Sequence, residues 1–114
     1  MKIKTILVSF YLLCSILIFA QSENNEFRST WVITWNWISP DDSMAETQAR
    51  ILEILDNHVA ANMTSVLFQV RQSGTAYYNS SYEPWGYYSG YQNPGFDPLE
   101  FAVEQAHLRG LEFH

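Results

Sequence analysis

The side chains with the most evident chemical potential lie between residues 72 and 96. This stretch is rich in tyrosine and holds one carboxylate among its rings, Glu83. A sugar stacks its C–H face on an indole or phenol ring, while its hydroxyls need polar partners. The stretch therefore predicts a carbohydrate-binding surface, with simple packing of the rings as the alternative. The rings are Tyr77, Tyr78, Tyr82, Trp85, Tyr87, Tyr88 and Tyr91.

The same stretch does not supply the carboxylate pair of a glycosidase. Hydrolysis of a glycosidic bond normally needs two carboxyl groups about 5 to 9.5 Å apart. Asp97 is expected to start a helix, and Asp41 with Asp42 is expected to serve a turn, which leaves Glu83 alone. One candidate is not a pair, so we expect this segment by itself to be inactive. No spacing of Cys, His and Asp resembles a metal site, and no cofactor is expected.

The elements that must position these residues alternate between strand and helix. β-Branched and aromatic residues favour the first strand, and a nearly continuous apolar run favours a second strand covered on both faces. Ser43 and Glu46 form a helix-capping pattern, and Asp97 followed by Pro98 forms another helix start. The predicted elements are a strand at 27–37, a helix from Ser43 to Asn62, a strand at 64–71, a helix from Asp97 to Gly110 and a strand from residue 111.

This alternation predicts the α/β class with a parallel sheet. The aromatic stretch then follows the carboxyl end of the second strand, where parallel α/β folds place their ligand sites. Its length, about 25 residues, far exceeds the usual two to six for such a connection. Three strands leave open edges, so we expect residues 27–114 to be the amino-terminal part of a larger domain. A truncated product that never folds is the alternative.

Polar residues gather on one predicted face of the later strands. Side chains alternate along a strand, so Gln69 and Arg71 share a face, as do Glu112 and His114. If the strands are neighbours in a barrel, these residues face its interior, with Arg71 and His114 nearest the mouth. An internal ion pair between Arg71 and Glu112 is the alternative. The predicted substrate-binding residues are Trp35, Asn36, Gln69, Arg71, Tyr78, Glu83, Trp85 and His114.

The first twenty residues have the composition of a secretory signal peptide. Two lysines precede an apolar run at 6–19, and Ala20 offers a small residue for cleavage. We expect residues 1–20 to be removed, 21–26 to be a linker, and the mature protein to be secreted or periplasmic without stable membrane insertion. A signal anchor is the alternative, although the run is shorter than the roughly 20 residues that span a bilayer.

The charge of the chain argues against a nucleic-acid partner. The 114 residues carry a formal net charge of −6. Removing residues 1–20 takes two of the six basic residues and leaves four against twelve acidic ones, a charge of −8. Such a surface repels phosphate backbones. Cleavage also removes Cys14, the only cysteine, so an exported chain would depend on packing instead of disulfides.

Several short motifs carry a family resemblance. They are Phe68-Gln69-Val70-Arg71, Tyr82-Glu83-Pro84-Trp85, Asp97-Pro98-Leu99 and Arg109-Gly110-Leu111-Glu112, the last followed by Phe113 and His114. With these motifs the sequence resembles the glycosyl hydrolase-like 10 family over nearly the whole mature segment. It departs from the family pattern at Gln72-Ser73-Gly74-Thr75, where Pro-x-Gly-Asp is more usual. One possible acidic site residue is therefore in doubt.

The resemblance implies a fold and a function. The fold is a (β/α)8 TIM barrel of roughly 250 residues, of which residues 27–114 would form the amino-terminal part. The function is hydrolysis of glycosidic bonds by an exported bacterial protein, with cell-wall glycan among the candidate substrates. The resemblance also implies that the catalytic acidic residues lie beyond His114, at the ends of later strands. A non-catalytic carbohydrate-binding or envelope-scaffolding protein is the alternative.

Overall fold

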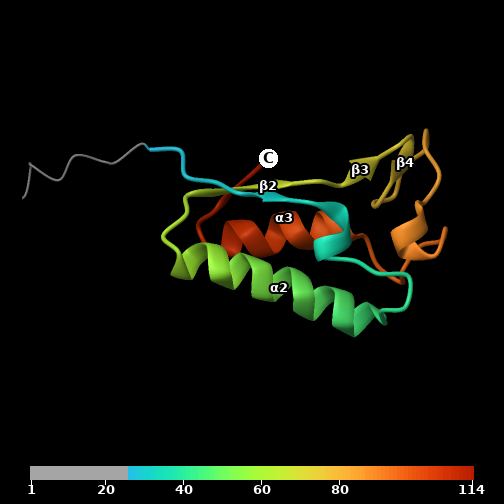
Figure 1. The fold of residues 1–114 in the computed structure, drawn as a ribbon, viewed down its shortest axis with the longest axis horizontal. Helices are drawn as coiled ribbons and strands as arrows, with labels where there is room; N and C mark the ends of the chain where they lie inside the picture. Colours follow the sequence, from blue (N-terminus) through green and yellow to red (C-terminus); the bar gives the residue numbers. More distant parts are fainter. Residues whose placement is uncertain (1–25) are drawn as a thin grey trace, which may run out of the picture.

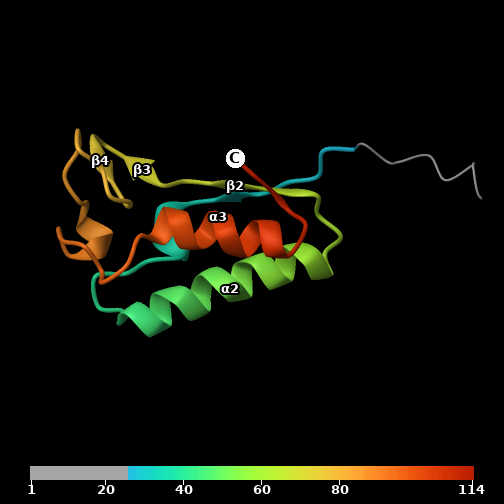
Figure 2. The ribbon, with the colours of Figure 1, turned by 180° about the vertical axis from the view of Figure 1, so that it is seen from behind.

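The computed structural model describes residues 26–114, and in it two helices lie on one face of a small parallel sheet (Figure 1). The view from behind shows the same arrangement, with both helices below the sheet (Figure 2). The sheet order is β1-β2-β5, with both pairs parallel. The predicted strand-helix alternation and parallel sheet are confirmed. The elements are β1 (Trp31–Val32), η1 (Thr34–Asn36), α2 (Met44–Ala60), β2 (Ser65–Phe68), β3 (Arg71–Gln72), β4 (Thr75–Ala76), η2 (Tyr87–Ser89), α3 (Pro98–Leu108) and β5 (Glu112–Phe113).

The first strand is much shorter than the predicted 27–37. After Val32 the chain turns into the 3-10 helix η1, because Thr34 is held by Gln69. The Thr34 amide and hydroxyl both donate to Oε1 of Gln69, at 3.1 and 3.0 Å. The indole of Trp37, which is fully buried, donates to the carbonyl of Gln69 at 3.2 Å. These contacts turn the chain across the end of β2, and aromatic composition alone did not reveal them.

Both helices begin where the capping patterns predicted. Oγ of Ser43 accepts from the Glu46 amide, and the Glu46 carboxylate accepts from the Ser43 amide, which is the reciprocal capping box of α2. Oδ1 of Asp97 accepts from the first free amides of α3. Gly110 follows α3 with a positive φ of 72°, a conformation that glycine adopts without a steric penalty. The two helix starts are therefore encoded locally.

The hydrophobic core lies between the sheet and the two helices. Phe68 and Val66 of β2 meet Ile51 and Leu55 of α2, and all are buried. Small residues of α3 let this helix approach closely, and the two helices are joined by an ion pair 2.6 Å long between Arg109 and Asp56 of α2. The further buried members of the core are Val32, Trp37, Ile38, Tyr77, Ala102, Ala106 and Leu111.

Within residues 26–114 the sheet is open. The register places Trp31 beside Leu67, and His114 lies level with Leu67 on the other side of β2. Trp31 and His114 share the sheet face that carries no helix, and Trp31 is 61% exposed there. In the described part of the chain no helix has the length and apolar character of a membrane span. The predicted signal peptide and residues 21–25 of the predicted linker lie outside the described residues.

Candidate functional site

The long connection after β2 is folded. It begins with a hairpin in which β3 and β4 pair antiparallel through a turn at Ser73 and Gly74. Both turn residues have positive φ, 52° and 75°, as a two-residue hairpin turn of type I′ requires. Ala76 of β4 then pairs in parallel with Trp85 and donates its amide to the Pro84 carbonyl at 2.9 Å. A segment predicted only as a loop therefore contains its own small sheet, next to the carboxyl end of β2 (Figure 1).

An ion pair joins the two sides of this connection. Nε of Arg71 donates to both carboxylate oxygens of Glu83, at 2.6 and 2.8 Å, and the Arg71 Nη2 contacts the same carboxylate. These hydrogen bonds hold the pKa of Glu83 below its ordinary value and raise the pKa of Arg71. The Glu83 side chain is only 18% exposed, whereas that of Arg71 is 60% exposed. Glu83 is thus held ionised, and Arg71 remains accessible from solvent.

The ion pair between Arg71 and Glu112 suggested by the sequence is wrong. Glu112 lies beside Ser65 at the start of β2, and its carboxylate is 3.2 Å from Nε2 of His114. His114 is level with Leu67, four residues before Arg71, which is about 13 Å along an extended strand. Arg71 and His114 therefore do not meet at one mouth.

A network of hydrogen bonds joins the two ends of residues 79–95 to each other and to the start of α3. Oδ2 of Asp97 accepts from the Asn79 amide at 2.9 Å while its Oδ1 caps α3. The side chain of Asn93 donates to Oδ1 of Asn79 at 3.0 Å and accepts from the Gly95 amide at 2.7 Å. The intervening segment is therefore tied at both ends to the start of α3. Such a compact surface excursion with joined ends is typical of functional loops.

The aromatic rings of the connection divide into a buried and an exposed set. Tyr77 is 2% exposed and meets Trp37 edge to face at 6.1 Å. Gly86 permits this packing, because a Cβ there would lie 2.3 Å from the Tyr77 hydroxyl. For Tyr77 the packing alternative is therefore confirmed. Tyr78, Trp85 and Tyr88 are half-buried, while Tyr82, Tyr87 and Tyr91 are exposed.

Trp35 extends the exposed set from η1. Its ring lies 6.1 Å from that of Tyr88, which lies 5.3 Å from that of Tyr87, and Tyr87 lies 6.0 Å from Tyr91. We call these four rings the aromatic row. Tyr87, Tyr88 and Tyr91 were not among the predicted substrate-binding residues. The glycines on either side of the short helix were a usable signal, since Gly90 has a positive φ of 67° and ends a tight turn that begins after Gly86.

The structure brings together only part of the predicted site. Arg71 and Glu83 are paired, whereas the Gln69 amide oxygen is occupied by Thr34. Asn36 is exposed and lines a hollow of about 270 Å³ beside β1 and α2, together with His58 and Asn57. Substrate contacts of the predicted residues remain predictions.

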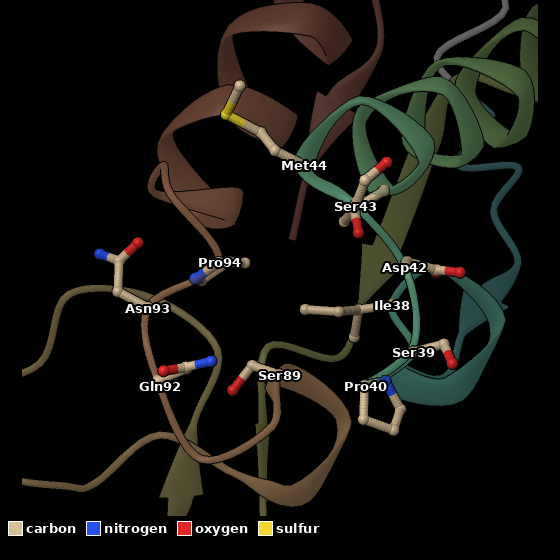
Figure 3. Close-up of a pocket in the computed structure, with 11 residues that line it drawn as sticks. Ile38, Ser39, Pro40, Asp42, Ser43, Met44, Ser89, Gln92, Asn93 and Pro94 are labelled. Atoms are coloured by element: carbon tan, nitrogen blue, oxygen red, sulfur yellow. The ribbon is translucent and has the colours of Figure 1, made fainter.

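A second hollow lies between the start of α2 and the end of the aromatic connection (Figure 3). It has a volume of about 270 Å³, close to the lower end of small-molecule sites, roughly 300 Å³. Its walls combine apolar side chains with amides and hydroxyls, and Asp42 in its wall accepts from Arg50 at 3.0 Å. Between residues 26 and 114, no three His, Cys, Asp or Glu side chains converge to hold a metal ion. The lining includes Ile38, Pro40, Met44, Ser89, Gln92 and Pro94.

The described residues match a known family throughout. The sequence profile of the glycosyl hydrolase-like 10 family covers residues 26–114. The chain belongs to this family. Membership confirms the resemblance carried by the motifs between residues 68 and 114.

Similar proteins show how much of a longer chain this sequence matches. It is 37% identical over 102 residues to glycosyl hydrolase YngK of Bacillus subtilis, which is 83% of this chain and 20% of that protein. It is 31% identical over 108 residues to glycosyl hydrolase DigH of Escherichia coli K12, which is 82% of this chain and 25% of that protein. The chain thus spans about a fifth to a quarter of the length of these relatives.

Proposed function

We propose that this chain is part of an exported glycoside hydrolase in which residues 27–114 form one wall of the sugar-binding cleft. The family and the names of both relatives support a hydrolase of glycosidic bonds. The observation that carries the proposal is the ordered aromatic connection beside the carboxyl end of β2, where parallel α/β folds bind ligands. The open sheet β1-β2-β5 is the expected beginning of a (β/α)8 barrel.

The lowered pKa of Glu83 supports a binding role for this residue over proton donation. A general acid of a glycosidase needs a raised pKa so that it stays protonated near neutral pH. Hydrogen bonds from Arg71 lower the pKa of Glu83, so its carboxylate stays ionised. In this proposal Arg71 and Glu83 hydrogen-bond sugar hydroxyls, Trp35 and Trp85 offer ring faces, and the catalytic carboxyl groups come from other parts of the protein.

The proposed substrate is bacterial cell-wall glycan, and the proposed location is the periplasm or the medium. The signal-like composition of residues 1–20 supports export, and an exported bacterial glycosidase meets cell-wall glycan first. Cell fractionation of the tagged protein tests the location, because retention in the cytoplasm would contradict export.

A non-catalytic carbohydrate-binding or envelope-scaffolding protein is the second candidate. The favouring observation is that the one carboxylate within the aromatic connection, Glu83, is neutralised by Arg71. A binding protein would keep the aromatic wall without an acid and a base.

Glycan turnover by the complete protein decides between the two candidates. The measurement is the release of new reducing ends from purified cell-wall glycan by the longest form that the gene encodes. We expect hydrolysis, and we expect Trp35→Ala to lower it while the unfolding temperature stays within a few degrees of the parent. Glycan binding by a folded protein without any bond cleavage would favour the non-catalytic candidate.

A further inference from the structure

The aromatic row forms a continuous path from the core to the surface. Tyr88 is half-buried and lies 6.2 Å from the buried ring of Tyr77. From Tyr88 the row runs to Trp35 on one side and through Tyr87 to Tyr91 on the other. Exposure is 48% for Trp35, 57% for Tyr87 and 70% for Tyr91. Neighbouring rings are tilted at 46° or meet edge to face at 78° and 75°, with centroids 5.3 to 6.1 Å apart, so the row offers solvent a stepped series of ring faces and edges.

The segment that carries the three tyrosines has no charge. Residues 86–96 read GYYSGYQNPGF, without a single Asp, Glu, Lys or Arg, in a chain whose formal net charge is −6. A surface of this kind lacks the Arg and Lys groups by which proteins bind carboxylate or phosphate. Its ring faces, phenol hydroxyls and the neighbouring Gln92 amide match the C–H faces and hydroxyls of uncharged sugars.

The backbone holds the tyrosines in place before any ligand binds. The amides of Gly90 and Tyr91 donate to the carbonyls of Tyr87 and Gly86, at 2.8 and 3.0 Å. Oγ of Ser89, a buried residue, donates to the Gly86 carbonyl at 2.9 Å. A preformed surface loses little conformational entropy on binding, so each ring contact contributes more of its interaction energy to affinity.

We infer that the aromatic row contacts consecutive sugar units of an extended glycan chain through their uncharged C–H faces and hydroxyls, so that affinity grows with the number of units. The inference rests on the proposed carbohydrate function and adds the length of the stretch that is bound. A site for a single sugar would need one ring and a pocket, whereas this row offers three exposed rings in sequence.

Titration with oligosaccharides of increasing length tests the inference in the complete protein. The probes are chito-oligosaccharides from the monomer to the hexamer, with calorimetry as the measurement. We expect the parent to bind the longer probes progressively more tightly. Tyr91→Ala and Tyr87→Ala should each weaken hexamer binding about tenfold, the equivalent of about 1.4 kcal/mol, and leave the shortest bound probe unaffected.

Tyr82→Ala is the matched control. Tyr82 is a loop tyrosine that is 97% exposed and lies outside the row. Its removal should change neither the length dependence nor the unfolding temperature. Losses of the same size from Tyr82→Ala and Tyr91→Ala would overturn the inference, because the row would then have no special role.

Three further outcomes separate this inference from the proposed function. Glycan hydrolysis by the parent with affinity independent of length overturns the inference and leaves the hydrolase proposal standing. Length-dependent binding that the tyrosine variants lose, without any hydrolysis, supports the row and contradicts the hydrolase. A lower unfolding temperature in Tyr87→Ala and Tyr91→Ala with unchanged binding shows that another part of the protein covers the row, which also overturns the inference.

Discussion

The helix-and-sheet layer and the aromatic connection are built by different kinds of contact. The layer consists of apolar side chains, such as Ile51 and Phe68, that interlock between β2 and α2. The connection is held by individual polar contacts, of which the Arg71 to Glu83 pair and the Asp97 to Asn79 bond are the main ones. The comparison teaches that one region determines stability, while the other can expose rings without weakening the core.

Trp37→Ala should give the largest effect, because this ring belongs to both regions. It is fully buried, meets Phe68 at 5.0 Å and Tyr77 at 6.1 Å, and donates to the Gln69 carbonyl. Truncating a buried aromatic residue costs about 3 to 5 kcal/mol of unfolding free energy. Urea denaturation measures this loss of unfolding free energy. A cost below about 1 kcal/mol would show that the two regions are not joined through this ring.

Gly86→Ala should come next. The added Cβ would lie 2.3 Å from the Tyr77 hydroxyl and 2.5 Å from Oγ1 of Thr75, so the packing must shift. Overpacking of this kind costs about 1 to 3 kcal/mol. Gly74→Ala separates steric crowding from backbone strain, since its Cβ would meet nothing within 4 Å. If Gly86→Ala is neutral in urea denaturation, the connection can move independently of the layer.

Asp97→Ala should lower the stability of α3 in the layer and also loosen the aromatic connection, and the two effects are measured separately. Loss of the cap of α3 should lower the unfolding free energy by roughly 0.5 to 2 kcal/mol. Loss of the hydrogen bond from the Asn79 amide should let residues 79–95 open more often. Ser43→Ala is the matched control, because it removes a cap from α2 and leaves the connection untouched. We expect hydrogen exchange at residues 79–95 to quicken only in Asp97→Ala. Equal exchange in both variants would show that the hydrogen bond from Asn79 to Asp97 does not hold residues 79–95 in place.

Acid should loosen the connection before it unfolds the layer. The pKa of Glu83 is lowered in the folded protein, so its ion pair contributes stability above the ordinary glutamate pKa, and that contribution is lost as pH falls through the lowered value. Protection from hydrogen exchange at residues 80–85, measured as the rate relative to the intrinsic rate at each pH, should therefore fall at acid pH in the parent. Glu83→Gln should show the reduced protection already at neutral pH. An identical pH dependence in both proteins would contradict this account.

Local signals explain why the layer could be predicted from the sequence. The capping groups Ser43 and Asp97 and the helix-ending Gly110 each act within a few residues and appear as predicted. The apolar strand is also present, but it covers Ser65–Phe68 instead of the predicted 64–71. The family motifs also identified the sequence family correctly. The predicted first strand was too long because the side chain of Gln69, distant in sequence, turns the chain at Thr34.

The candidate site was less predictable because it depends on contacts between distant residues. The sequence pointed to the aromatic connection and to Arg71 and Glu83, but not to their pairing with each other. It placed His114 near Arg71, since strand alternation fixes a face and leaves the register open. Which tyrosines face solvent depends on the packing of Gly86 against Tyr77, a contact with no local signature.

The most direct test of the division between the two regions is a paired measurement on Trp35→Ala in the complete protein. Trp35 is 48% exposed and contacts Tyr88, so its removal should cost little unfolding free energy. Calorimetry should show glycan affinity lowered about tenfold, or about 1.4 kcal/mol, with the urea midpoint nearly unchanged. Unchanged affinity together with a clearly lower midpoint would show that the ring supports the fold, and the connection would then not be a sugar-binding wall.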